Sequence, residues 1–324
     1  MRPLPDLELL RPATAADAVL LLRRDATRAI AGGTDLLPNL RRGLGVPRRL
    51  VDLGAIHGFA KAEALPTHWR LGAGLTLAAL AAHPGIGAAL PALVQAAAAV
   101  AGPAHRTSAT LGGNLCQDTR CVFVNQGAWW RGAIDGCLKA GGTVCHVAPQ
   151  GRRCRAAYEG DVAAALIALD AQVATLGPQG PRQLPVHALY RDDGAAHLAL
   201  DAGEIVVAVE VPLPAAGSAN GYRKQRVRGA MDFPLAGVAA SLRRDGGVLA
   251  TLAVGITGTD SQPLRLAGTE ALLGRTVDDT LLAELGRLVQ QQVHPMRSTV
   301  TAAHHRRLVA AVAAQRLVRE LWGR

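Results

Sequence analysis

All five cysteines of this 324-residue chain lie in one short stretch, between Cys116 and Cys154. Their spacing is C-x4-C-x15-C-x7-C-x8-C, and glycines recur between them, so we expect turns and loops here instead of long helices or strands. An odd number of clustered cysteines argues against an extracellular disulfide framework. Thiolates are also ligands that soft metal centres prefer. The stretch therefore predicts an irregular loop built around a metal or redox centre, in a reducing compartment.

The cysteine spacing alone leaves the kind of centre open. Structural zinc sites usually contain closely spaced C-x2–4-C pairs, and only Cys116 and Cys121 come near that spacing. Four thiolates that arrive from separate loop turns are typical of iron–sulfur clusters. Iron–sulfur is favoured, with zinc and unmetallated thiols as the alternatives.

Other side chains of the same stretch suggest how such a centre is surrounded. We expect Trp129 and Trp130 to pack over it, and His146 to be a hydrogen-bonding neighbour instead of a ligand. The cations of the stretch would offset the negative charge of a thiolate-bound cluster, or else form a solvated basic face; they are Lys139, Arg152 and Arg153.

Two glycine pairs mark a second kind of site. The first follows a predicted strand at residues 28–31 and reads Ala31-Gly32-Gly33-Thr34-Asp35-Leu36, and the second lies in Thr110-Leu111-Gly112-Gly113-Asn114. Glycine lets the backbone turn sharply and approach a ligand, and the free N–H groups of such a turn can hold a pyrophosphate. A plain strand–turn–helix joint is the alternative for the first pair. No G-x-G-x-x-G motif follows a strand and no G-x-x-x-x-G-K-[ST] occurs, so a Rossmann or P-loop site is not supported.

The remaining pattern predicts two domains. Apolar periodicity predicts helices at residues 13–28 and 90–102, and a further helix that begins at Asp161. The polar, glycine-containing segment 215–221 is the best boundary. Beyond it, the pattern predicts antiparallel strands followed by helices at 277–293 and 299–321, which is an α+β arrangement. We therefore expect domains at 1–215 and 216–324, with the cysteine stretch as an insert at about 116–156.

The net charge is strongly positive, so a nucleic-acid partner has to be considered. The formal net charge is +10, but only three of the 35 basic residues are lysine, and the arginines are scattered in pairs instead of forming a stripe with aromatic residues. We therefore expect no nucleic-acid partner. No uncharged apolar segment is long enough to span a membrane, and the first residues lack the apolar core of a signal peptide, so a cytoplasmic location is expected.

At this point the residues resemble a known family. The segments AGGTDLLP (31–38) and TLGGN (110–114) are similar to the two flavin-binding motifs in the FAD subunits of molybdenum hydroxylases, a group that includes xanthine and carbon monoxide dehydrogenases. The resemblance covers essentially the whole chain. It implies an α+β fold: an FAD-binding part of the vanillyl-alcohol-oxidase type, with two α/β subdomains, followed by a C-terminal α+β domain.

The resemblance also implies roles for single residues. The pyrophosphate end of FAD would be held by the two glycine turns, that is, by Ala31, Gly32, Gly33, Thr34, Asp35, Leu36, Thr110, Gly112, Gly113 and Asn114. Asp161 would accept hydrogen bonds from the ribityl hydroxyls, with a helix N-cap as its alternative role. Lys224 would lie near the isoalloxazine, with a surface position as the alternative.

Within the family, the insert resembles that of the β subunits of 4-hydroxybenzoyl-CoA reductases. The run NLCQDTRC, the later CHVAP and the EGD that follows carry this similarity, and these subunits hold an extra [4Fe-4S] cluster in the same loop. The resemblance implies that the cluster ligands are Cys121, Cys137, Cys145 and Cys154, and that Cys116 is not a ligand. Val124 departs from the pattern, because a second aromatic residue is expected there.

The function implied is electron transfer within a larger complex. Electrons would come from a low-potential, ferredoxin-like donor, pass through the [4Fe-4S] cluster and FAD, and reach [2Fe-2S] clusters on a small subunit and a molybdopterin centre on a large subunit. There 4-hydroxybenzoyl-CoA would lose its ring hydroxyl to give benzoyl-CoA, in a complex expected to be a dimer of heterotrimers. The alternatives are the FAD subunit of an oxidative molybdenum hydroxylase and a zinc-stabilised flavin-binding protein without redox flow.

Overall fold

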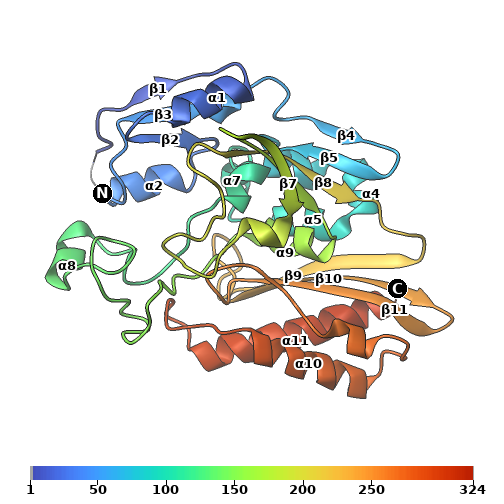
Figure 1. Cartoon of the computed structure of the whole chain (residues 1–324). Helices are drawn as coiled ribbons and strands as arrows, with labels where there is room; N and C mark the ends of the chain where they lie inside the picture. Colours follow the sequence, from blue (N-terminus) through green and yellow to red (C-terminus); the bar gives the residue numbers. More distant parts are fainter. Residues whose placement is uncertain (1–2, 324) are drawn as a thin grey trace.

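A computed structural model describes residues 3–323, and it begins with a small parallel sheet. The strands β1 (Glu8–Leu10), β2 (Thr27–Ile30) and β3 (Arg49–Asp52) pair in the order β1-β3-β2, with helices α1 (Ala15–Leu22) and α2 (Leu36–Arg41) beside them (Figure 1). Helix α1, predicted at 13–28, begins after Thr14, whose Oγ1 accepts from the N–H of Asp17 at 3.1 Å. It ends earlier than predicted, because the chain reverses at Ala26 (φ 52°) and the residues from Thr27 onward join the sheet.

A five-stranded antiparallel sheet forms the second layer. Its order is β4 (Ala62–Ala64), β5 (His68–Gly72), β8 (Ile205–Pro212), β6 (Gln172–Gly177) and β7 (Gly180–Pro185). Helices α3 (Leu77–Ala82), α4 (Pro84–Ala89), α5 (Pro91–Ala99), α6 (Pro103–Arg106) and α7 (Leu111–Leu115) connect β5 to the insert. Helix α9 (Asp161–Ala168) returns from the insert, and each of its residues is buried. Short 3-10 turns lie at Leu53–Ala55, Val186–Leu189 and Thr269–Leu272.

The C-terminal part is an antiparallel sheet with helices on one face. Strands β9 (Ser218–Gln225), β10 (Ala236–Asp245), β11 (Val248–Thr257) and β12 (Leu264–Arg265) lie in the order β12-β11-β10-β9. Helices α10 (Asp279–Gln292) and α11 (Ala303–Trp322) cover the outer face, and α9 and α5 pack on the other side (Figure 1). At Gly255 a Cβ atom would lie 2.1 Å from the carbonyl oxygen of Ala164, so glycine is what allows β11 and α9 to touch. The predicted α+β class is confirmed.

The insert runs outside these layers. Its one regular helix among the described residues, α8 (Ala128–Ala133), projects beside α2 at the edge of the molecule (Figure 1). Arg131 is buried and donates to the carbonyl oxygens of Arg42 (2.9 Å) and Val124 (3.3 Å), which fixes α8 to the loop after α2. Within residues 3–323 there is no helix with the length and apolar character needed to cross a membrane.

Candidate cofactor-binding site

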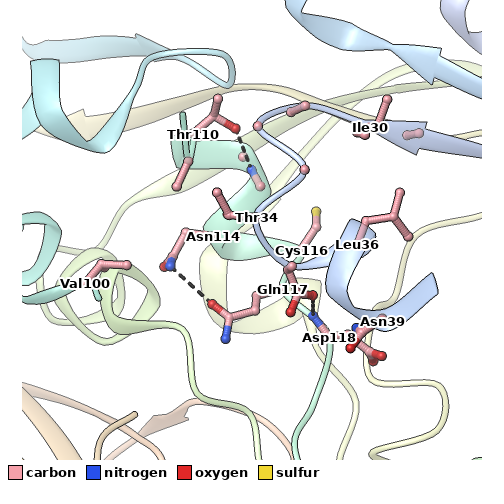
Figure 2. Close-up of a pocket in the computed structure, with 18 of the residues that line it drawn as sticks. Ile30, Thr34, Leu36, Asn39, Val100, Thr110, Asn114, Cys116, Gln117 and Asp118 are labelled. Carbon is pink, nitrogen blue, oxygen red and sulfur yellow. Dashed lines mark hydrogen bonds between the residues drawn. The ribbon is translucent and has the colours of Figure 1, made fainter. Parts of the chain in front are cut away.

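A cavity of about 710 Å³ opens between the N-terminal sheet, the second glycine turn and strand β9. Figure 2 shows part of its lining, where Thr34 from the first turn lies close to Thr110 and Asn114 from the second. The structure brings every predicted flavin contact to this one cavity: Ala31, Gly32, Gly33, Thr34, Asp35, Leu36, Thr110, Gly112, Gly113, Asn114, Asp161 and Lys224.

The two glycine turns are in direct contact. A Cβ atom added at Gly32 would lie 1.9 Å from the carbonyl oxygen of Ser108, just before the second turn. Gly33 has φ 68°, a conformation that favours glycine, and it leads the chain from β2 into α2. A Cβ atom at Gly112 would lie 2.8 Å from that of Ala73. Glycine at these positions is therefore what lets three backbone segments meet at the cavity wall.

Side chains of the second turn hold its shape. The hydroxyl of Thr110 caps α7 by accepting from the N–H of Gly113 at 3.1 Å (Figure 2). Asn114 is buried, and its Oδ1 accepts from the N–H of Val162 at 3.2 Å while its amide donates to Gln117 at 3.4 Å. Asn114 thus joins α7 to the first turn of α9, a structural role that its position in the motif did not reveal.

Asp35 points toward the start of the insert. Its Oδ2 accepts from the backbone N–H of Asp118 at 3.0 Å, and its Oδ1 forms an ion pair with Arg120 (Figure 2 shows the Asp118 contact). Arg120 is buried, also donates to Asn39 at 3.0 Å, and lies over the ring of Phe233 at 5.3 Å. Arg120 could not be recognised as a cavity residue from the sequence, because its partner Asp35 is distant in the chain.

Asp161 and Lys224 form a buried pair in the cavity wall. The two charged atoms are 3.0 Å apart, both side chains are 3% exposed, and Lys224 also donates to the carbonyl of Ala99. Tyr222 donates its hydroxyl to the other oxygen of Asp161 at 2.5 Å. Asp161 is the first residue of α9 and does not cap it, and Lys224 is not at the surface, so neither alternative role applies. Burial raises the pKa of Asp161, and Lys224 opposes that rise.

Glu159 is a second cavity residue that the sequence did not single out. It is 2% exposed, its Oε1 lies 4.0 Å from Arg306 of α11, and its Oε2 has no hydrogen-bond partner within residues 3–323. Burial raises its pKa to about 8, although the charge of Arg306 acts in the opposite direction. Its proximity to Asp161 in the segment Glu159-Gly160-Asp161 was the only signal available.

Four cysteines line a separate, smaller cavity inside the insert: Cys121, Cys137, Cys145 and Cys154. All are buried free thiols, whereas the fifth cysteine, Cys116, lines the larger cavity instead. Burial raises the pKa of Cys154 to about 11. Among the described residues, no group of three or more His, Cys, Asp or Glu side chains is positioned to hold a metal ion. The four thiols thus line one small cavity without forming a metal-binding group in the described residues.

The prediction for Trp129 is wrong. Its side chain is 84% exposed on α8, because the buried anchor of that helix is Arg131 two residues later. Phe123 and His146 line the cysteine cavity instead, with their rings stacked at 5.3 Å. His146 donates to the carbonyl of Gly136 at 2.6 Å, in line with a neighbouring role. Trp130 is partly buried, 6.1 Å from the ring of Phe123.

Comparison with known proteins agrees with this geometry. Residues 5–214 match the family described as FAD binding domain in molybdopterin dehydrogenase, and residues 221–321 match the CO dehydrogenase flavoprotein C-terminal domain. The chain belongs to the FAD-binding subunits of the molybdenum hydroxylase family. We infer that the large cavity holds the FAD, because both glycine segments lie in its wall, and it is called the flavin cavity below.

Relatives cover nearly the whole of this flavin subunit. It is 34% identical to the aldehyde oxidoreductase FAD-binding subunit PaoB of Escherichia coli, over 83% of this chain and 87% of that one. It is 28% identical to the carbon monoxide dehydrogenase medium chain of Afipia carboxidovorans, over 95% and 94%. The crystal structure of the Cu,Mo-CO dehydrogenase in its cyanide-inactivated form superposes with a TM-score of 0.82 at 25% identity, over 99% of both chains.

Proposed function

We propose that this FAD-binding subunit also holds a [4Fe-4S] cluster on Cys121, Cys137, Cys145 and Cys154, and that it carries electrons within a molybdenum-containing complex. The observation that supports the cluster is the placement of four buried, free thiols around one cavity beside the flavin cavity. Ligands of a four-iron cluster bind different metal atoms, so they enclose a volume, as these thiols do. When bound, the flavin exchanges one or two electrons and the cluster exchanges single electrons.

The residues of the larger cavity would hold and orient the flavin. The turn at Gly32–Asp35 would offer backbone N–H groups to the pyrophosphate, since N–H-lined turns bind anions. The N–H groups of Leu111 to Asn114 are bonded within the protein, so the second segment would contribute by close backbone approach. Asp161 and Lys224 supply a fixed pair of charges whose positions are set by Tyr222 and the carbonyl of Ala99.

The residues of the smaller cavity would exclude water from the cluster. Val124 and Ala156 are buried beside Cys121 and Cys154, and Leu138 packs against them. Val124, the departure from the family pattern, is 1% exposed, so an aliphatic side chain fills that position without opening the cavity. A dry, apolar surrounding is one of the factors that set the potential of an iron–sulfur cluster.

For the complex, we propose reductive dehydroxylation of 4-hydroxybenzoyl-CoA to benzoyl-CoA. The motifs NLCQDTRC and CHVAP support this, because they resemble the insert of that reductase's β subunits. The partners would be a large molybdopterin subunit and a small [2Fe-2S] subunit, in a dimer of heterotrimers supplied by a ferredoxin-like donor. Their location would be cytoplasmic.

Aldehyde oxidation is a second candidate. The observation that favours it is the 34% identity to an aldehyde oxidoreductase subunit over most of both chains. In this case electrons would leave through the subunit to an acceptor instead of entering from a donor.

The cluster is tested by measuring iron, acid-labile sulfide and FAD in the anaerobically purified chain. We expect iron and sulfide in equal amounts, and a Cys137→Ser variant that loses both while keeping FAD. Zinc in place of iron contradicts the proposal, and loss of FAD together with iron means that the insert is structural to the flavin site. Assays of the purified complex, with 4-hydroxybenzoyl-CoA and a reduced low-potential donor or with aldehydes and an oxidant, then separate the two reactions.

A further inference from the structure

Lys139 is the one Lys or Arg among the described residues that line the cysteine cavity. Its side chain is only 10% exposed. Its ammonium donates to Asp118 Oδ1 at 2.6 Å, to the carbonyl of Gly194 at 2.7 Å and to the hydroxyl of Thr119. An ammonium has three N–H donors, so these acceptors use all of them and hold the charge in one place.

The partner of Lys139 belongs to the flavin cavity. Asp118 lines that cavity, and its backbone N–H donates to Asp35 of the first glycine turn at 3.0 Å (Figure 2). The ion pair between Lys139 and Asp118 therefore crosses the wall that separates the two cavities. Thr119, beside Asp118, is buried, and Lys139 is the buried member of the pair, whereas the side chain of Asp118 is 39% exposed.

The ammonium of Lys139 lies close to groups of both cavities. Lys139 itself lines the smaller cavity together with Cys137 and Cys154. It also acts, after burial, to lower the pKa of His197 to about 4, and His197 lines the flavin cavity. Lys139 thus lies within electrostatic reach of both cofactor positions.

We propose that Lys139 sets the reduction potential of the cluster held by the four cysteines, with Asp118 as the residue that positions it. This inference rests on the proposed function. Reduction adds one electron, and so one negative charge, to a centre already bound by four thiolates. A fixed and largely buried cation stabilises the reduced form more than the oxidised form, which raises the potential. Asp118, of opposite charge, holds the ammonium and partly offsets it.

The test is a potentiometric titration of the full chain, followed by EPR, after iron, sulfide and FAD have been measured in each variant. In Lys139→Met we expect the equilibrium constant for one-electron reduction to fall at least tenfold, a potential lower by about 59 mV. Lys139→Arg keeps the charge and should stay within threefold of wild type. Arg152→Met, which removes an exposed cation of the insert, should change nothing.

Asp118→Asn gives an independent measurement in case Lys139→Met does not assemble its cluster. It removes a negative charge from the same wall, so the potential should rise. A Lys139→Met or Asp118→Asn protein with a full cluster and the wild-type potential overturns the inference and leaves the proposed function intact. A wild-type chain without iron and sulfide overturns both.

Discussion

The substitution Gly32→Ala tests the contact on which the flavin cavity depends. The added methyl group would lie 1.9 Å from the carbonyl oxygen of Ser108 and 2.9 Å from the backbone nitrogen of Ala109. Both neighbours are backbone atoms, so no side-chain rotation relieves the clash. The two glycine turns would have to separate by roughly 1 Å, as expected for overpacking at a tight contact.

The size of the effect follows from the geometry. Overpacking costs about 1–3 kcal/mol of stability. We expect a cost near the upper end of this range, because the added methyl group meets backbone atoms. Where this strain is present in the flavin-bound form and relieved in the free form, a cost of about 3 kcal/mol raises the Kd for FAD roughly 100-fold. The assay is a fluorescence titration of the FAD-free chain with FAD, together with a thermal denaturation curve.

The matched control is Gly127→Ala at the start of α8. A Cβ atom at Gly127 has no neighbour within 4 Å, and its φ of −65° suits alanine. This variant should bind FAD as the wild type does. The reasoning is refuted if Gly32→Ala binds FAD with the wild-type Kd and unfolds at the wild-type temperature.

Two further predictions concern the buried charges. Burial raises the pKa of Glu159 from near 4.5 to about 8, so the folded chain binds a proton that the unfolded chain has lost between these values, and its free energy of unfolding should fall as the pH rises from 5 to 8. Urea unfolding should show a smaller fall in Glu159→Gln, and an equal fall in both proteins would contradict the assignment. Lys224→Met leaves the carboxylate of Asp161 buried without its cation, which should cost about 3–5 kcal/mol of stability. The double variant with Asp161→Asn should recover most of this loss in the same assay, and a cost below about 1 kcal/mol for the single variant would argue against a buried pair.

The glycine turns could be predicted from the sequence because their signal is local. At the first turn a strand, a glycine pair and a helix follow one another, and the conformation of Gly33 depends on its own backbone. The second pair, Gly112 and Gly113, lies inside helix α7. The start of α1 was equally local, since Thr14 accepts from the N–H of Asp17 three residues later. The helix that begins after Thr110 was not predicted. The cofactor, FAD, was predicted from the resemblance of these segments to a known family.

The charge network could not be predicted, because each pair joins distant parts of the chain. Arg120 meets Asp35, Lys224 meets Asp161, and Glu159 meets Arg306 only after the three sheets have assembled. No periodicity in the sequence carries that information. The prediction for Trp129 was wrong for a related reason. The insert is irregular, so no repeating pattern of apolar residues indicates which of its side chains are buried.

The most direct test of the account is the EPR spectrum of dithionite-reduced Cys116→Ser protein. Cys116 lies on the flavin cavity, whereas the proposed ligands Cys121, Cys137, Cys145 and Cys154 line the other one. The account predicts the signal of a reduced [4Fe-4S] cluster at the wild-type intensity per chain. A wild-type signal that disappears in Cys116→Ser, or no cluster signal in either protein, would contradict it.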